Sequence, residues 1–209
     1  MVNILKVETE KEECLKAARK SLKSKKLVIY PTDTVYGLGA DATSDKAVKK
    51  VYEAKSRPSE KPISVAVDSV SMAEKVGDID KYEKVVMEEI LPGPLTLIVE
   101  PNSYVSNFLT GNTEKIGVRI PKHTLILELI ERLNRPITTT SANITGRENP
   151  KTPEEAINQL EESVELVLDD GKLGDDEPST VAKLDNSNVQ IIREGPISKS
   201  DIQSIIGKF

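Results

Sequence analysis

Apolar residues along the chain follow two patterns, short runs and helical stripes. The short runs are rich in β-branched residues and predict strands at 2–7, 27–30, 63–67, 95–99, 116–120, 136–140, 164–168, 179–184 and 189–193. The stripes have a period near 3.6 residues and predict helices that bury Cys14, Leu15, Ala18 and Leu22, then Ala47, Val48, Val51 and Ala54, and later much of 124–133.

Capping residues predict where several helices begin. Thr9 and Ser44 are the expected N-caps of the first two helices, and Asp68 or Ser69 is the expected start of a helical region after them. The segment 152–155 (Thr-Pro-Glu-Glu) places a hydroxyl, a proline and a glutamate as a capping box requires.

The order of these elements favours one α/β domain over residues 1–209. Strands and helices mix without strict βαβ alternation, and the last third of the chain is richer in adjacent strands. We therefore expect a twisted open sheet of parallel and antiparallel strands with flanking helices.

Composition excludes several classes of protein. The chain is acidic, with a formal net charge of −5, whereas a general nucleic-acid coat needs an excess of Lys and Arg. One cysteine and one histidine exclude an intramolecular disulfide and a Cys/His zinc site. Because no stretch resembles a membrane span or a secretory signal, we expect a cytoplasmic protein without a membrane partner.

The segment 31–42 (PTDTVYGLGADA) is the first candidate for a binding site. It follows the apolar run 27–30, contains hydroxyls, a carboxylate, a phenol and two glycines, and precedes the helix expected after Ser44. A strand, a glycine-containing loop and a helix N-terminus in this order often form an anion or nucleotide site. An ordinary βα turn, in which the glycines only relieve backbone strain, is the alternative.

Five basic residues lie beside strand ends or turns. Lys55, Arg57 and Lys61 share a proline-stiffened segment, which brings like charges together unless an anion neutralises them. Arg119 lies in an apolar strand, where an unpaired guanidinium is costly, and Arg193 ends another strand. Each one taken alone is an ordinary surface charge.

Hydroxyl and amide side chains occur at similar places, where α/β folds put ligands; these are Thr34, Thr139, Ser141, Asn143 and Ser179. Such loops are ordinarily only turns. The sequence contains no Walker-type or Gly-x-Gly-x-x-Gly motif and no evident Ser–His–Asp set. The inventory suits phosphate binding and charge neutralisation better than it suits a covalent nucleophile.

Seven segments together carry a resemblance to a known family: PTDTVYGLGADA at 31–42, KSRPSEKP at 55–62, PGPLT at 92–96, VRIPKH at 118–123, TTSANITG at 139–146, PSTV at 178–181 and IIREG at 191–195. In this order they resemble the YrdC/YciO family of threonylcarbamoyl-AMP synthases. The resemblance implies a twisted open sheet around a concave basic cavity, and a short single-domain member without the linker and second domain of longer ones.

The resemblance also implies a reaction and its partners. L-threonine and bicarbonate form a carbamate, whose carboxylate attacks the α-phosphate of ATP to give threonylcarbamoyl-AMP and pyrophosphate. Mg²⁺ would accompany ATP, held mainly by the phosphates near Ser141 and Asn143. A separate tRNA threonylcarbamoyl transferase, or a KEOPS-type complex, then modifies a tRNA adenosine beside the anticodon, so tRNA is an indirect or weak partner.

The family's functional residues map onto this chain position by position. The resemblance gives Lys55 and Arg57 as catalytic residues that hold the bicarbonate or carbamate and the phosphates. The residues that the resemblance implies for binding threonine or bicarbonate are Thr34, Arg119, Thr139 and Ser179. The residues that the resemblance implies for binding ATP are Arg57, Lys61, Ser141, Asn143, Asn149 and Arg193. Ala66 stands where many members have histidine, so we expect a threonine pocket that differs in detail.

Two other interpretations remain open from the sequence. One is an RNA-binding or ribosome-associated module that uses the same cavity without chemistry. The other is the YciO-like branch of the family, with the same fold and a weak or different activity. The pairs Lys55-x-Arg57 and Ser141-x-Asn143 favour the active synthase.

Overall fold

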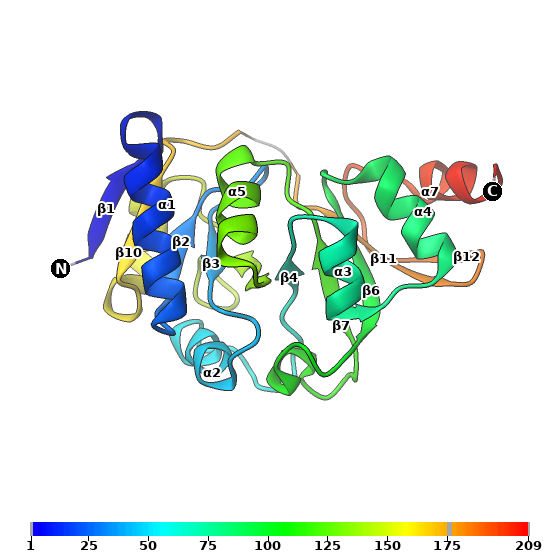
Figure 1. Ribbon diagram of the computed structural model, residues 1–209, viewed down its shortest axis with the longest axis horizontal. Helices are drawn as coiled ribbons and strands as arrows, with labels where there is room; N and C mark the ends of the chain where they lie inside the picture. Colours follow the sequence, from blue (N-terminus) through cyan, green and yellow to red (C-terminus); the bar gives the residue numbers. More distant parts are fainter. Residues whose placement is uncertain (1, 175–176, 209) are drawn as a thin grey trace.

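The computed structural model of the chain describes residues 2–174 and 177–208 and contains two mixed sheets (Figure 1). One sheet has the order β1-β10-β2-β3-β9, formed by Asn3–Lys6, Leu166–Asp169, Val28–Tyr30, Gly37–Gly39 and Thr140–Ser141. The other has the order β12-β11-β6-β7-β4-β8, formed by Asn188–Arg193, Thr180–Asp185, Leu95–Pro101, Ile116–Arg119, Val65–Ala66 and Ile137–Thr138. The short strand β5 (Gly77–Asp78) pairs with β6. This is the predicted mixture of parallel and antiparallel strands, divided between two sheets.

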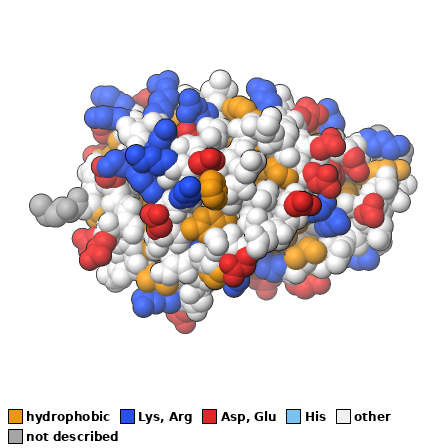
Figure 2. Space-filling view, turned by 90° about the horizontal axis from the view of Figure 1, so that it is seen from below, with side chains coloured by type: hydrophobic (Ala, Val, Ile, Leu, Met, Phe, Trp, Pro, Cys, Tyr) orange, Lys and Arg blue, Asp and Glu red, His pale blue; other side chains and the backbone are white. Residues whose placement is uncertain are grey.

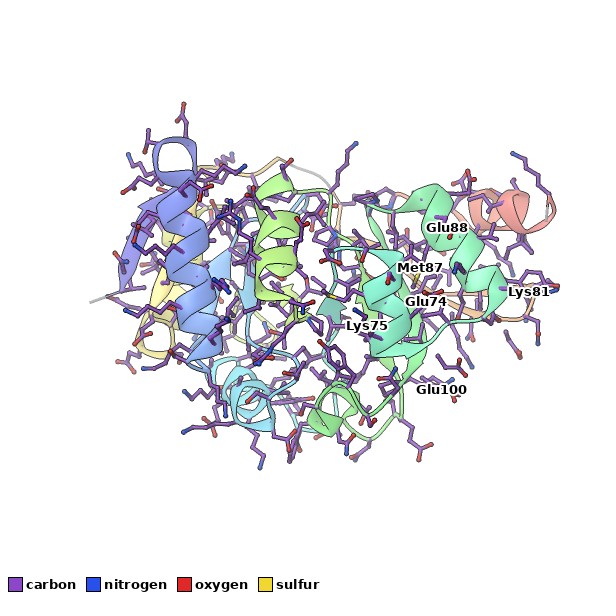
Figure 3. All side chains as sticks on the ribbon, in the orientation of Figure 1. Glu74, Lys75, Lys81, Met87, Glu88 and Glu100 are labelled. Carbon is purple, nitrogen blue, oxygen red and sulfur yellow. The ribbon has the colours of Figure 1, made fainter. Side chains whose placement is uncertain are left out.

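Helices cover the outer faces of both sheets (Figure 1). Helices α1 (Val7–Lys23) and α5 (Thr124–Leu133) lie side by side over the first sheet. The second sheet carries α3 (Val70–Val76), α4 (Lys81–Ile90) and α7 (Lys199–Ile206). Figure 3 shows Met87 between α3 and α4, where it is fully buried. The remaining helical segments are α2 (Asp45–Ala54), η1 (Asn107–Thr110), α6 (Pro153–Leu160) and η2 (Glu161–Ser163).

Most of the predicted helix starts are confirmed. Ser69 caps α3 by accepting a hydrogen bond from the backbone N–H of Met72, and the capping box of α6 forms as expected. The expected cap at Thr9 is wrong, because α1 already begins at Val7. The Glu10 carboxylate accepts a hydrogen bond from the N–H of Lys6 at 2.9 Å, and Glu10 itself has non-helical backbone angles that kink the first turn.

The segment 31–42 is not the ordinary βα turn that was the alternative to a binding site. Strands β2 and β3 run antiparallel, so this segment folds back on β2 before α2 begins. Gly39 packs on the ring of Tyr30, where a Cβ atom would lie 2.8 Å from Cε1. Ser44 precedes α2 as predicted, but its hydroxyl makes no capping hydrogen bond. The glycines therefore bring two strands together rather than shape a helix N-terminus.

Thr138 joins the two sheets. Its Oγ1 accepts a hydrogen bond from the N–H of Ala40 and donates one to the carbonyl of Leu38, both at 2.9 Å, and the side chain is fully buried. We expect Thr138→Val, which keeps the shape, to lower the free energy of unfolding by about 2–4 kcal/mol because two buried backbone groups lose their partner.

Urea denaturation measures this effect, and Thr138→Ser, which keeps the hydroxyl, is the matched control. If the valine variant were as stable as the serine variant, the hydroxyl would not hold the sheets together.

The surface is mixed in charge. Figure 2 shows Lys and Arg side chains gathered at one end of the face seen from below, where α1 ends and α2 lies, although the whole chain is acidic. Within residues 2–174 and 177–208, no helix combines the length and apolar character that crossing a bilayer requires.

Candidate active site

A polar cavity of about 250 Å³ is lined by residues of both sheets and of the segments between their strands. Eight of the eleven predicted site residues line it: Thr34, Arg57, Arg119, Thr139, Ser141, Asn149, Ser179 and Arg193. They come from segments far apart in the sequence, and the fold brings them together. Lys55, Lys61 and Asn143 are not part of the cavity wall.

A turn at residues 32–35 presents Thr34 to the cavity. The hydroxyl of Thr32 donates to the carbonyl of Val35 at 2.7 Å and accepts from the N–H groups of Thr34 and Val35 at 3.1 and 3.2 Å. Thr32, which also lines the cavity, was not a predicted site residue. The tendency of Thr hydroxyls to bond the backbone two or three residues ahead was the signal for it.

Arg57 and Arg193 face the cavity with partners that carry no charge. Arg57 donates from Nη2 to the carbonyl of Pro62 at 2.7 Å, and from Nε to that of Lys61 at 3.3 Å. Arg193 donates from Nη2 to the carbonyl of Ser179 at 2.6 Å. Among the described residues neither guanidinium has a carboxylate partner. Burial lowers the pKa of both side chains, as expected for cations held without counter-ions.

Arg119 differs from these two arginines because it has a counter-ion. Its Nη2 donates to Oδ1 of Asp33 at 2.6 Å, and both side chains are largely buried. The expected cost of a guanidinium in an apolar strand is thus offset by an ion pair. Nε of Arg119 is buried and has no hydrogen-bond partner within residues 2–174 and 177–208. Asp33 was not predicted as a site residue, since only the fold brings β7 to the turn at 32–35.

Ser179 belongs to a chain of hydroxyls on the same wall. Its Oγ accepts a hydrogen bond from Nη2 of Arg193 at 3.1 Å and lies 3.0 Å from Oγ1 of Thr96. Thr96 ends the PGPLT segment and lines the cavity, although it was not predicted as a site residue. Ala66 is fully buried in β4, paired in register with Arg119, and is not part of the wall.

Lys55 lies behind the cavity wall. Its ammonium donates to the carbonyl of Ser141, and to the carbonyl and Oδ1 of Asn143 at 2.7 and 3.1 Å. Burial, followed by the charge of Arg57, lowers the pKa of Lys55 to about 7. Lys61 is exposed. Lys55 therefore supports the loop that carries Ser141, and its predicted catalytic role stays a prediction.

The family model for the Sua5/YciO/YrdC domain, described as "Telomere recombination", matches residues 20–195. A Methanocaldococcus jannaschii protein, provisionally named a threonylcarbamoyl-AMP synthase, is 38% identical over 194 residues, covering 92% of this chain and 91% of the relative. The Pyrococcus abyssi threonylcarbamoyl-AMP synthase is 33% identical over 211 residues, covering all of this chain but 62% of the relative.

Solved structures agree with the family match. The P. abyssi Sua5 structure in complex with L-threonine superposes with a TM-score of 0.90 at 31% identity, covering 99% of this chain and 61% of that one. Escherichia coli YciO superposes with a TM-score of 0.83 at 24% identity, covering 93% and 96%, which shows a common fold. This chain belongs to the Sua5/YciO/YrdC family.

Proposed function

We propose that this protein is an L-threonylcarbamoyladenylate synthase. The observation that carries the proposal is the charge of the cavity. Three guanidinium groups from separate segments line it, those of Arg57, Arg119 and Arg193. Of these three, only Arg119 has a carboxylate partner among the described residues. Such a wall is suited to bind a polyanion together with a smaller anion.

The proposed chemistry needs alignment and charge neutralisation more than it needs a nucleophile. An oxygen of the carbamate attacks the α-phosphorus of ATP, and the bond from phosphorus to the bridging oxygen breaks as pyrophosphate leaves. Arg57 and Arg193 would neutralise charge on the phosphates as it develops. Thr34, Thr139 and Ser179 would orient the threonine carbamate.

The cavity continues into a groove that can hold the rest of the nucleotide. The groove has a volume of about 720 Å³ and shares Val35, Asn149 and Pro178 with the cavity. We assign the nucleoside half of ATP to this groove, with Asn149 between the phosphates and the nucleoside.

Mg²⁺ bound to ATP is part of the proposal. Among the described residues no group of three His, Cys, Asp or Glu side chains could hold a metal, so the phosphates would be its main ligands. The hydroxyl of Ser141 lines the cavity and fits this role. Asn143 does not fit, because its Oδ1 already accepts hydrogen bonds from Lys55 at 3.1 Å and Ser141 at 2.5 Å.

The product implies further partners. In the proposal a tRNA threonylcarbamoyl transferase, alone or in a KEOPS-type complex, receives threonylcarbamoyl-AMP and modifies tRNA in the cytoplasm. Contact of this chain with tRNA itself is expected to be indirect or weak, because the net charge is −5.

Release of pyrophosphate from ATP tests the proposed reaction. With Mg²⁺ present, we expect release that requires both L-threonine and bicarbonate, and little release when either is omitted. Release that is indifferent to both would indicate another ATP-consuming activity. No release, together with tight RNA binding, would favour the binding module. Dependent release at a rate far below that of an established synthase would favour the YciO-like branch.

A further inference from the structure

We propose that Asp33 is a positioning residue that sets Arg119 for the carboxylate of an amino acid and separates this subsite from the phosphate subsite. The inference rests on the proposed function and adds to it a residue, Asp33, that keeps the expected threonine and ATP subsites apart.

The position of Asp33 indicates that it acts through Arg119. Oδ1 of Asp33 lies 2.6 Å from Nη2 of Arg119, and the two side chains are 13% and 7% exposed. Arg119 lines the cavity, whereas Asp33 lies behind it. The turn that Thr32 organises holds Asp33 in this place while it turns Thr34 toward the cavity. Asp33 therefore fixes one side of the guanidinium. A ligand bound in the cavity would contact the remaining side.

One N–H group of Arg119, at Nε, has no acceptor among the described protein groups around it. Nε is buried and has no hydrogen-bond partner in the part of the chain that the structure describes. A buried, unsatisfied N–H of a charged group is costly, so the arrangement is complete only when a ligand brings an oxygen to it. A carboxylate oxygen is the natural acceptor for a guanidinium N–H.

Charge balance divides the cavity into two subsites. Arg57 and Arg193 donate to carbonyl and hydroxyl groups and keep their full charges, which suits a polyphosphate. Arg119 and Asp33 together are neutral, which suits an amino acid whose ammonium and carboxylate also sum to zero. Without Asp33, Arg119 would become a third uncompensated cation and would attract phosphate into the amino-acid subsite.

Asp33→Asn tests this division, because the amide keeps the shape and removes the charge. We measure the affinities for L-threonine and for ATP separately by titration calorimetry. We expect threonine affinity to fall at least tenfold, as for the loss of a charged hydrogen bond, and ATP affinity to stay the same or rise. An unchanged affinity for threonine would overturn the inference.

Asp41→Asn is the matched control. Asp41 is a buried carboxylate that forms an ion pair of similar length, 2.7 Å, with the more exposed Arg135, away from the cavity wall. We expect this variant to bind threonine and ATP as the wild type does. A loss of threonine affinity as large as that of Asp33→Asn would mean that any broken Asp–Arg pair disturbs the cavity, and the positioning role would be wrong.

A double-mutant cycle shows whether Asp33 acts through Arg119. In the Arg119→Lys background, we expect Asp33→Asn to cause little further loss of threonine affinity. Additive losses would contradict action through Arg119. If Asp33→Asn does not fold, Asp33→Glu replaces it, since the longer side chain displaces the charge; unchanged threonine affinity in that variant would also overturn the inference.

The same titrations separate this inference from the proposed function. If the wild type binds ATP but no threonine, the proposed function fails, and this inference fails with it. If the wild type binds threonine and Asp33→Asn binds it equally well, only the inference about Asp33 fails.

Discussion

Replacing Arg193 by alanine should reduce pyrophosphate release at least tenfold while the protein stays folded. The side chain lines the cavity without a carboxylate partner among the described residues, so its full charge is available to the phosphates. Loss of a hydrogen bond to a charged group typically costs about 1.5–3 kcal/mol, which corresponds to a tenfold or greater loss. Arg193 also holds the carbonyl and the hydroxyl of Ser179, so the same change loosens the wall beside it.

Arg57→Ala should lose turnover to a similar extent. Arg57 also lines the cavity, and among the described residues its guanidinium donates hydrogen bonds only to backbone carbonyls. Arg132→Ala is the control, because Arg132 forms surface ion pairs with Glu12 and Glu128 away from the cavity. The rate of pyrophosphate release is measured for Arg193→Ala, Arg57→Ala and Arg132→Ala, and circular dichroism checks that each variant is folded. Near-normal release by either cavity variant would remove that arginine from the phosphate site.

Replacing Lys55 by methionine should affect both stability and turnover. The variant keeps the length of the buried side chain but leaves the carbonyls of Ser141 and Asn143 without their shared donor. We expect the free energy of unfolding to fall by about 1–3 kcal/mol at pH 7, and turnover to fall at least tenfold as the loop of Ser141 loosens.

Lys50→Met is the control for this variant. Lys50 lies on α2, the helix that ends just before Lys55, and it donates to one surface carbonyl, that of Lys25, at 2.8 Å. We expect a change in unfolding free energy within about 0.5 kcal/mol and normal turnover. If the two methionine variants behaved alike, the support that Lys55 gives to the loop would be unimportant.

Lys55 should also make stability depend on pH. Its pKa is about 7 in the folded protein, against an ordinary value of 10.5. Between these values the unfolded chain holds a proton that the folded protein has released. The free energy of unfolding should therefore rise with pH in this window, by at most about 1.4 kcal/mol per pH unit, with no slope from this group below pH 7. Urea denaturation from pH 6 to 9 measures the slope; if Lys55→Met keeps it, the slope comes from another group.

The local signals in the sequence predicted most of the elements. Helix α5 occupies 124–133 as its apolar stripe indicated, and the capping box at 152–155 forms with both of its hydrogen bonds. Strands β11 and β12 form at the two runs predicted at 179–184 and 189–193, and they pair antiparallel. The interactions that decide such elements lie within a few residues, so composition and spacing reveal them. The cap at Thr9 failed because the Glu10 carboxylate bonds the N–H of Lys6 and α1 begins earlier.

Contacts between segments far apart in the chain could not be predicted from such local sequence signals. Within the segment 31–42, Gly37–Gly39 forms a strand antiparallel to β2, and its glycines lie against Tyr30. A glycine in a sequence permits a turn as readily as it permits close approach of a ring. Which of the two occurs depends on whether a partner strand is present.

The sequence by itself determined the family and the mixed α/β class, and it pointed to the cavity's three arginines and to some of its hydroxyl residues, because these depend on residue types, local spacing and the order of short motifs. Only the tertiary structure decided which of those residues line the cavity and which lie behind its wall. It placed Arg57, Arg119 and Arg193 on the wall, Lys55 behind it, and Asp33 beside Arg119 across 86 positions of sequence. An ion pair forms where the folded backbone brings two side chains within about 3 Å, and no local pattern in the sequence encodes that distance.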